Sequence, residues 1–172
     1  MPRSIRESLE SATQRIGISR VDRSFGRARY DSDLNKKPWR TYYFYLNGKA
    51  VPEHLEECPI TTKVLEQVPH NGLHVCFSAI DPGGALVPHT GPTNTSLTAH
   101  LGLLNCEDSL LCVANRSQTY KTDDVVIFDD SFVHWAANNG TRTRYTLIIT
   151  FWHPELTFLE RALLNRLIGI AQ

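Results

Sequence analysis

From residue 73 to residue 152 the sequence is a series of short β-forming stretches separated by turns. The expected strands, rich in β-branched and aromatic residues, are 73–80, 84–87, 96–104, 110–114, 118–120, 125–128 and 142–152. Turn signals such as Pro82-Gly83 and Asn139-Gly140 stand between them, and no helical period intervenes. Parallel strands need long crossovers, which are usually helices. The pattern therefore predicts an all-β core of antiparallel strands, arranged as a sandwich or jelly roll.

The segments before this region have mixed character. Residues 3–16 carry apolar residues at near-helical spacing and predict a short amphipathic helix, whereas residues 20–38 predict a loop or lid. Residues 39–47 are dense in aromatic residues and predict a strand, most of whose rings we expect in the core. Residues 58–68 predict a helix with Pro59 in its first turn.

The C-terminus predicts a further helix. Thr157 and Glu160 fit the capping box, in which each side chain bonds the backbone N–H of the other residue at a helix start. Apolar residues then recur on one face of the expected helix, at Leu159, Leu163, Leu167 and Ile170. We expect this helix to pack on the outside of the barrel or to form a homodimer contact.

Length and charge limit the classes of protein to consider. With 172 residues, 18 basic and 18 acidic, the chain predicts one domain without the basic excess of a nucleic-acid-binding protein. No apolar run approaches the roughly 20 residues of a membrane span, and Glu7 and Glu10 interrupt the region where a signal peptide would be apolar. The four cysteines form no C-x-x-C pair and predict buried thiols in a reducing compartment. We expect a cytoplasmic protein.

Strand alternation indicates which side chains share a face. In the strand 96–104, Ser96, Thr98 and His100 lie on one side and leucines lie on the other. In the last strand, Arg144 shares a face with small polar and apolar residues, which is typical of a pocket wall rather than a solvated surface. A guanidinium there suits a bidentate interaction with a carboxylate.

His89 and His134 are the candidate metal ligands. Each follows residues that restrict the local backbone near an expected strand end, in VPH (87–89) and in DDSFVH (129–134). Imidazole suits iron, zinc, copper and nickel, so the histidines alone leave the metal open. The alternative is that each histidine is bonded to the backbone and has no ligand role.

Four motifs resemble the aspartyl/asparaginyl β-hydroxylase family, and they occur in the same order with similar gaps. The resemblance covers about residues 39–157 and rests on PHTGPTN (88–94), HLGL (100–103), FDDSFVH (128–134) and FWHPELT (151–157). It implies an Fe(II)- and 2-oxoglutarate-dependent oxygenase on a double-stranded β-helix, a cupin-like jelly roll. We accordingly expect a single oxygenase domain over 1–172, with an N-terminal helix and loop (1–38), a jelly-roll core (39–153) and a C-terminal helix (154–172).

The resemblance also implies roles for individual residues. His89 and His134 match the two iron-binding histidines, and Gly91 reproduces the family's glycine in place of a third, carboxylate ligand. Arg144 and Ser78 match the residues that hold the distal carboxylate of 2-oxoglutarate, and His100 matches the histidine that contacts the carboxylate beside the keto group. Asp129 and Asp130 are interpreted as turn and strand-end residues.

The chain departs from the family at two positions. Ser96 and Thr98 stand where peptide-hydroxylating members have arginines that help bind the acidic substrate and the co-substrate. A buried carboxylate without a cationic partner is costly. An aspartyl substrate would therefore need a replacement cation, for which the candidates are Arg27, Arg29, Arg40 and Arg142. We expect Ser96, Thr98, Arg29 and Arg40 to be the residues nearest the substrate.

The expected reaction is hydroxylation of a C–H bond in a small-molecule or biosynthetic substrate, with O2 and 2-oxoglutarate consumed and succinate and CO2 released. The same cofactors would also serve desaturation, ring formation, or β-hydroxylation of an aspartyl or asparaginyl residue in a peptide. A non-catalytic jelly-roll binding module and a zinc hydrolase are more remote alternatives. We expect no nucleic acid and no membrane among the partners.

Overall fold

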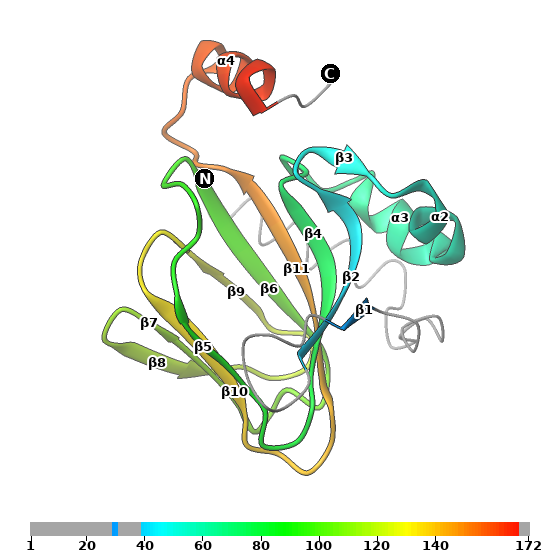
Figure 1. Ribbon diagram of the computed structural model, residues 1–172, viewed down its shortest axis with the longest axis vertical. Helices are drawn as coiled ribbons and strands as arrows, with labels where there is room; N and C mark the ends of the chain where they lie inside the picture. Colours follow the sequence, from blue (N-terminus) through cyan, green and yellow to red (C-terminus); the bar gives the residue numbers. More distant parts are fainter. Residues whose placement is uncertain (1–28, 31–38, 169–172) are drawn as a thin grey trace.

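The computed structural model describes residues 29–30 and 39–168, and within these ranges two antiparallel sheets face each other (Figure 1). The larger sheet has the order β1-β2-β4-β11-β6-β9, with β3 beside β2. Its strands are β1 (Arg29–Tyr30), β2 (Trp39–Leu46), β3 (Lys49–Ala50), β4 (His74–Ile80), β6 (Ser96–Leu104), β9 (Val125–Phe128) and β11 (Arg144–Trp152). The smaller sheet has the order β5-β10-β7-β8, with β5 (Ala85–His89), β7 (Ser109–Val113), β8 (Arg116–Thr119) and β10 (His134–Asn138). The predicted all-β antiparallel core is confirmed.

Two short helices cover the larger sheet on the side away from the smaller one (Figure 1). They are α2 (Pro52–Glu57) and α3 (Pro59–Leu65), and each has a proline in its first turn. Proline suits that position because the first N–H groups of a helix have no intrahelical partner. The predicted helix over 58–68 is thus confirmed in its start, although it ends at Leu65, and α2 was not predicted.

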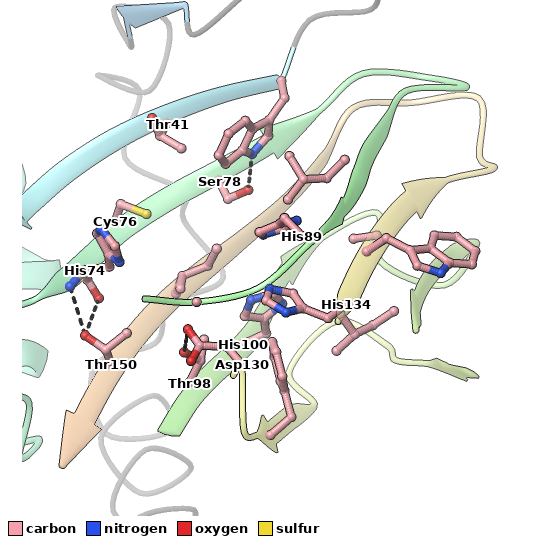
Figure 2. A pocket seen from close by; sticks show the side chains of 18 of the residues that line it. Thr41, His74, Cys76, Ser78, His89, Thr98, His100, Asp130, His134 and Thr150 are labelled. Atoms are coloured by element: carbon pink, nitrogen blue, oxygen red, sulfur yellow. Dashed lines mark hydrogen bonds between the residues drawn. The ribbon is translucent and has the colours of Figure 1, made fainter. Parts of the chain in front are cut away.

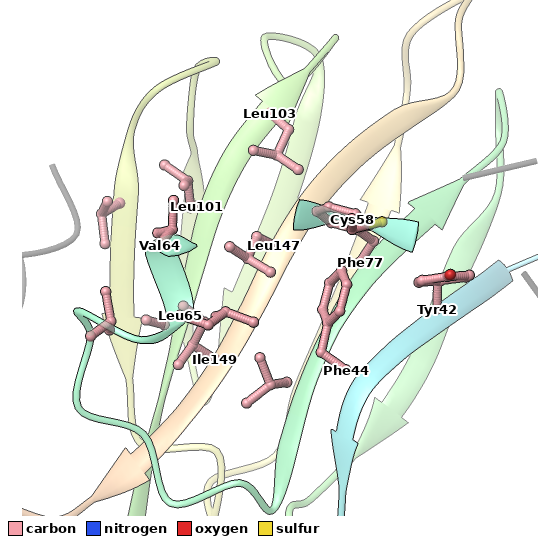
Figure 3. Close-up of a cluster of buried hydrophobic side chains, with 14 of the residues drawn as sticks. Tyr42, Phe44, Cys58, Val64, Leu65, Phe77, Leu101, Leu103, Leu147 and Ile149 are labelled. Atoms are coloured by element: carbon pink, nitrogen blue, oxygen red, sulfur yellow. The ribbon is translucent and has the colours of Figure 1, made fainter. Parts of the chain in front are cut away.

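The main hydrophobic core lies between α3 and the larger sheet (Figure 3). Alternate residues of the central strands, such as Phe77, Leu101, Leu147 and Ile149, are fully buried there against Val64 and its helical neighbours. Burial of one such side chain contributes about 1.5–3 kcal/mol. Because strand residues alternate between faces, the remaining side chains of these strands point toward the smaller sheet. This second face carries the candidate site.

The aromatic residues of β2 divide between the two faces. Tyr42 and Phe44 are buried in the main core, as predicted. Trp39 and Tyr43 instead line a cavity on the other face, because they occupy the opposite strand parity. Tyr45 also packs against the main core, so the expectation that most of the rings would lie in the core is confirmed, with Trp39 and Tyr43 as the exceptions.

The helix α4 (Phe158–Ile168) begins with the predicted capping box. Thr157 N–H donates to Glu160 Oε2 (2.7 Å), and Glu160 N–H donates to Thr157 Oγ1 (3.3 Å). The helix stands beyond the end of the larger sheet (Figure 1) and leaves Leu163 53% and Leu167 82% exposed. The expectation that this face of the helix packs on the barrel is therefore wrong. The homodimer contact stays a prediction.

Two further expectations concern the N-terminal region. The helix expected over 3–16 lies outside the described residues. Within the expected loop 20–38, Arg29 and Tyr30 form β1, whose backbone pairs with Thr41 and Arg40, so this part of the loop prediction is wrong. The four cysteines are free and buried, as expected. In the part of the chain that the structure describes, no helix is long and apolar enough to cross a membrane.

Candidate active site

A cavity of about 240 Å³ lies between the two sheets. Its walls come from β2, β4, β6 and β11 of the larger sheet, and from β5, β10 and the turn after His89 on the opposite side. A water molecule occupies roughly 30 Å³ in the liquid. The cavity is therefore large enough for a small organic molecule rather than for a few waters.

Strand pairing arranges the floor of the cavity in rungs, which are sets of residues paired across β2, β4, β11 and β6. At one end, Trp39 and Arg144 both pair with Ile80. We name this the arginine end. The next rung brings together Thr41 and Ser78, and Trp39 Nε1 donates to Ser78 Oγ across the two rungs (2.9 Å).

The following rungs lead to the other end of the cavity. Ile148 pairs with both Cys76 and His100, and two residues further along β11, Thr150 pairs with Thr98. We name the rung of Thr98 and Thr150 the threonine end. Thr150 lies six positions after Arg144 on β11, so the two ends lie about 20 Å apart along the strand.

His89 and His134 face each other on the opposite wall. They are direct cross-strand partners on β5 and β10, and their ring centroids lie 4.2 Å apart (Figure 2). His89 Nδ1 is 2.8 Å from Val87 O, and His134 Nδ1 is 2.9 Å from Phe132 O. A carbonyl oxygen only accepts, so each Nδ1 carries a proton, and Nε2 is the ring nitrogen left to bind a metal. The two Nε2 atoms can therefore serve together as metal ligands.

Burial keeps the nearby imidazoles neutral. Desolvation lowers the pKa of His134, and it lowers that of His100 to about 3, with smaller contributions from Arg144 and the two paired histidines. His100 is 7% exposed, and its Nδ1 has no hydrogen-bond partner. A buried polar atom without a partner is costly. His100 is therefore available to bind a polar group of a ligand.

Asp130 lies beside the histidine pair and is more than a turn residue. Thr98 Oγ1 donates to Asp130 Oδ2 (2.9 Å), and the carboxylate rests against Gly91, where an added Cβ would come within 2.5 Å of Asp130 Cγ. Asp129 has the expected turn role, because its Oδ1 accepts from Ser131 N–H (2.9 Å). Among residues 39–167, no three His, Cys, Asp or Glu side chains form a group that could hold a metal ion.

Arg144 is buried without an acidic partner among the described residues. It is 1% exposed, and its Nη1 donates to the hydroxyl of Tyr120, while Nε has no partner. Burial raises the pKa of Tyr120 to about 12, so the phenol stays neutral and does not balance the guanidinium charge. A buried charge of this kind calls for an anionic ligand.

Three residues of the arginine end and the floor were missed by the sequence reasoning. They are Trp39, which bonds Ser78, Tyr120, which bonds Arg144, and Cys76, which shares a rung with His100 through Ile148. Strand parity would have found Cys76, because it lies two residues before Ser78.

The candidate substrate residues have different positions. Thr98 lines the cavity, whereas Ser96 does not, and Ser96 Oγ accepts from Asn71 Nδ2 (2.8 Å). Arg40 is directed away from the cavity, because its guanidinium makes a bidentate pair with Asp81 (2.8 Å for both bonds). Arg142 is exposed and does not line the cavity. The side chain of Arg29 and all of Arg27 lie outside the described residues.

The sequence model of a known family matches most of the chain. Residues 3–154 match the family described as Aspartyl/Asparaginyl beta-hydroxylase. The chain belongs to the aspartyl/asparaginyl β-hydroxylase family. The two histidine motifs and the arginine of β11 lie within the matched region.

Similar proteins within this hydroxylase family differ in their named substrates. The Homo sapiens Aspartyl/asparaginyl beta-hydroxylase is 34% identical over 137 residues, covering 76% of this chain and 18% of that protein. The Rhizobium tropici Ornithine lipid ester-linked acyl 2-hydroxylase is 33% identical over 134 residues, covering 74% of this chain and 47% of that protein. The chain thus spans less than half the length of these curated relatives.

A solved structure supports the fold independently of the sequence. A predicted oxalate decarboxylase from Thermotoga maritima superposes with a TM-score of 0.51 at 12% identity, covering 78% of this chain and all of that one. At this identity the likeness concerns the fold alone. It agrees with the cupin-like jelly roll that the family resemblance implied.

Proposed function

We propose that this hydroxylase-family chain is an Fe(II)- and 2-oxoglutarate-dependent oxygenase that hydroxylates a C–H bond. The observation that carries the proposal is the cavity itself, with the paired histidines His89 and His134 on one wall and the unbalanced guanidinium of Arg144 at one end. A metal site and an anion site in one enclosed space suit a reaction that uses a metal and an acidic co-substrate.

The histidine pair fits iron(II). The Nδ1 protons of the two imidazoles are held by Val87 O and Phe132 O, which leaves the two Nε2 atoms to bind a metal, and second-shell carbonyls of this kind orient metal-binding histidines. Imidazole is a normal ligand of non-haem iron. The two histidines would leave several coordination positions for a chelating co-substrate, water and O2.

The arginine end of the cavity fits the distal carboxylate of 2-oxoglutarate. Arg144 supplies a buried cation with an unpartnered Nε, and Ser78 lies on the neighbouring rung with its hydroxyl fixed by Trp39. His100, with its unpartnered Nδ1, pairs with Ile148 of β11. Ile148 lies four residues after Arg144, about 13 Å along the strand. A long arginine side chain and a five-carbon keto-diacid together suit that span.

The reaction consumes one substrate R–H, one O2 and one 2-oxoglutarate, and yields R–OH, succinate and CO2. Bound iron(II) supplies the activation of O2, which amino-acid side chains cannot provide. The chain orients the co-substrate through Arg144, keeps His100 neutral by burial, and excludes water with apolar walls that include Leu86, Phe128 and Ile148. The protein's contribution is position and a dry site.

The proposed substrate class is a small molecule or biosynthetic intermediate. Thr98 replaces one of the arginines that the resemblance assigns to binding of an acidic peptide side chain, and it contacts Asp130 instead. Neither Arg40 nor Arg142 compensates inside the cavity. These features make an aspartyl side chain a poor fit at the threonine end.

Succinate formation tests the proposal. The purified chain with iron(II), ascorbate and 2-oxoglutarate is expected to release succinate, and candidate substrates are expected to stimulate the release. A product that gains one oxygen would support hydroxylation, whereas loss of two hydrogens would indicate desaturation or ring formation. Absence of both iron(II) binding and 2-oxoglutarate binding would contradict the proposal and favour a non-catalytic jelly-roll module.

A further inference from the structure

The middle of the cavity floor is uncharged. Between the arginine end and the threonine end, Tyr43, Cys76 and Ile148 are paired across β2, β4 and β11, and all three line the cavity. We name these three residues the central rung. Burial raises the pKa of Cys76 to about 12, so the thiol is neutral, and a buried thiol behaves as a small hydrophobic group. The central rung therefore offers a ligand an aromatic ring, a thiol and an aliphatic chain.

The polar side chains of the neighbouring threonine end are bonded within the protein. Thr98 Oγ1 donates to Asp130 Oδ2 (2.9 Å), and Thr150 Oγ1 donates to Asn71 Oδ1 (2.7 Å). A hydroxyl has one proton, so neither threonine has a proton left for a ligand. Burial lowers the pKa of His74, which lines the cavity beside Thr150 (Figure 2) and is uncharged near neutral pH. The two threonines and His74 therefore offer no charge to a ligand.

Apart from histidines, the described cavity lining contains two ionisable side chains that are charged at neutral pH, and both have other roles. Arg144 is the proposed partner of the co-substrate. Asp130 lies beside the His89–His134 pair, and bound iron(II) would balance its charge (Figure 2). A charged substrate group over the central rung would be buried without a partner, which is costly. An apolar group gains free energy from the same burial.

We propose that the reacting part of the substrate is an uncharged hydrocarbon group, which rests on the central rung and faces the histidine pair across the cavity. This inference rests on the proposed function and deepens it, because it names the chemical class of the substrate. That class is a molecule whose reacting C–H bond lies in an apolar segment. Charged parts of such a molecule would stay at the mouth of the cavity, where the lining residues Thr90 and Pro92 are exposed.

A series of alcohols tests the apolar character of the central rung. Dissociation constants of 1-propanol, 1-butanol and 1-pentanol are measured by ligand-observed NMR on the full chain, with 2-oxoglutarate filling the arginine end. Zinc(II) replaces iron(II), because it is diamagnetic and imidazole binds it. We expect each added methylene to tighten binding about three- to fourfold. n-Pentylamine, which is charged at neutral pH, should bind at least about tenfold more weakly than 1-pentanol.

Ile148→Thr and Ile127→Thr form a matched pair of variants. Both isoleucines are partly buried strand residues of the larger sheet, but Ile127 packs against the main core and does not line the cavity. Threonine keeps the branched shape and adds a hydroxyl. We expect Ile148→Thr to weaken binding of 1-pentanol at least about threefold, and Ile127→Thr to leave it unchanged. If Ile148→Thr does not fold, Cys76→Ser should weaken 1-pentanol, with Cys112→Ser as the control outside the cavity lining.

Four results would each overturn the inference: equal affinities along the alcohol series, no binding of any alcohol, n-pentylamine binding as tightly as 1-pentanol, or undiminished binding of 1-pentanol in Ile148→Thr. Binding of zinc(II) and of 2-oxoglutarate, measured by calorimetry on the same samples, separates the inference from the proposed function. A chain that binds both but fails the alcohol test contradicts the apolar substrate surface alone. A chain that binds neither contradicts the proposed function and the inference together.

Discussion

Replacement of Arg144 by methionine separates ligand binding from folding. The side chain is 1% exposed, and in the described part of the chain it has the hydroxyl of Tyr120 as partner but no carboxylate. Methionine preserves much of the length and the apolar stem while removing the charge. We expect the variant to fold and to lose affinity for 2-oxoglutarate.

The magnitude follows from the bonds that the guanidinium would make. A bidentate interaction with the distal carboxylate comprises two charge-assisted hydrogen bonds, each contributing about 1.5–3 kcal/mol, so their joint loss costs about 3–6 kcal/mol. At about 1.4 kcal/mol per tenfold, the dissociation constant of 2-oxoglutarate should rise by roughly 100- to 20,000-fold. Isothermal titration calorimetry on the unaltered chain and the variant measures this change.

The same variant has a second expected outcome. Removal of a buried charge that lacks a counter-ion relieves a desolvation cost, which offsets the loss of the bond to Tyr120. We therefore expect the free energy of unfolding without ligand to change by less than about 1.5 kcal/mol. Urea unfolding measures it.

Arg142→Met is the control, because Arg142 is exposed only two residues away. Weakening of 2-oxoglutarate binding by less than threefold in Arg144→Met, or equal weakening in Arg142→Met, would refute a carboxylate-binding role for Arg144. Unfolding of the unliganded Arg144→Met protein in buffer alone would show that the guanidinium is needed for folding and would refute the expected separation of binding from folding.

Four further outcomes are expected. His89→Ala and His134→Ala should each abolish iron-dependent succinate release, and activity in either would show that the site is misassigned. Tyr120→Phe should raise the KM for 2-oxoglutarate by about 3- to 10-fold with kcat unchanged, because one hydrogen bond of about 0.5–1.5 kcal/mol orients Arg144; an unchanged KM would argue against this positioning. Because the folded pKa of His100 is about 3 and the unfolded value is about 6.5, the unfolded chain takes up the proton first as pH falls. Stability of the metal-free chain, measured by urea unfolding, should therefore fall between pH 7 and pH 5, by about 2 kcal/mol at most from this group, and His100→Gln should flatten the slope. Gly102→Ala should destabilise the fold by about 1–3 kcal/mol in the same assay, because an added Cβ would collide with Lys121 O, and a neutral result would contradict the close approach seen there.

Much of the fold could be predicted because it depends on local pattern. The strands over 96–104 and 125–128 have the predicted bounds, since leucine and alanine alternate with polar residues or glycine over most of the first, and the second is a run of β-branched and aromatic residues. The missed strand β10 contains Ala136 and Ala137, which have no strand preference of their own. It forms because β5 and β7 pair with it on both sides. Such tertiary pairing leaves no signal in the segment itself.

The site could be predicted only in part for a similar reason. Strand parity placed Thr98, His100 and Arg144 on the cavity face, where the structure has them. Tyr120 could not be found, because its bond to Arg144 joins residues 24 positions apart. The same holds for the pairing of Arg40 with Asp81, which removes Arg40 from the cavity and depends on a turn 41 residues away. Long-range hydrogen bonds of this kind arise only once the sheet has formed.

The pairing of β2, β4, β11 and β6, which forms the cavity floor, limits how the ligand specificity of the cavity can change. A shift of one residue in the pairing of β11 would turn Arg144 and Thr150 into the helix-covered interior and bring leucine and isoleucine out to meet the ligand. No gradual displacement lies between these two arrangements. New specificity in this scaffold must therefore arise by exchange of individual side chains at fixed positions, never by sliding one strand along another.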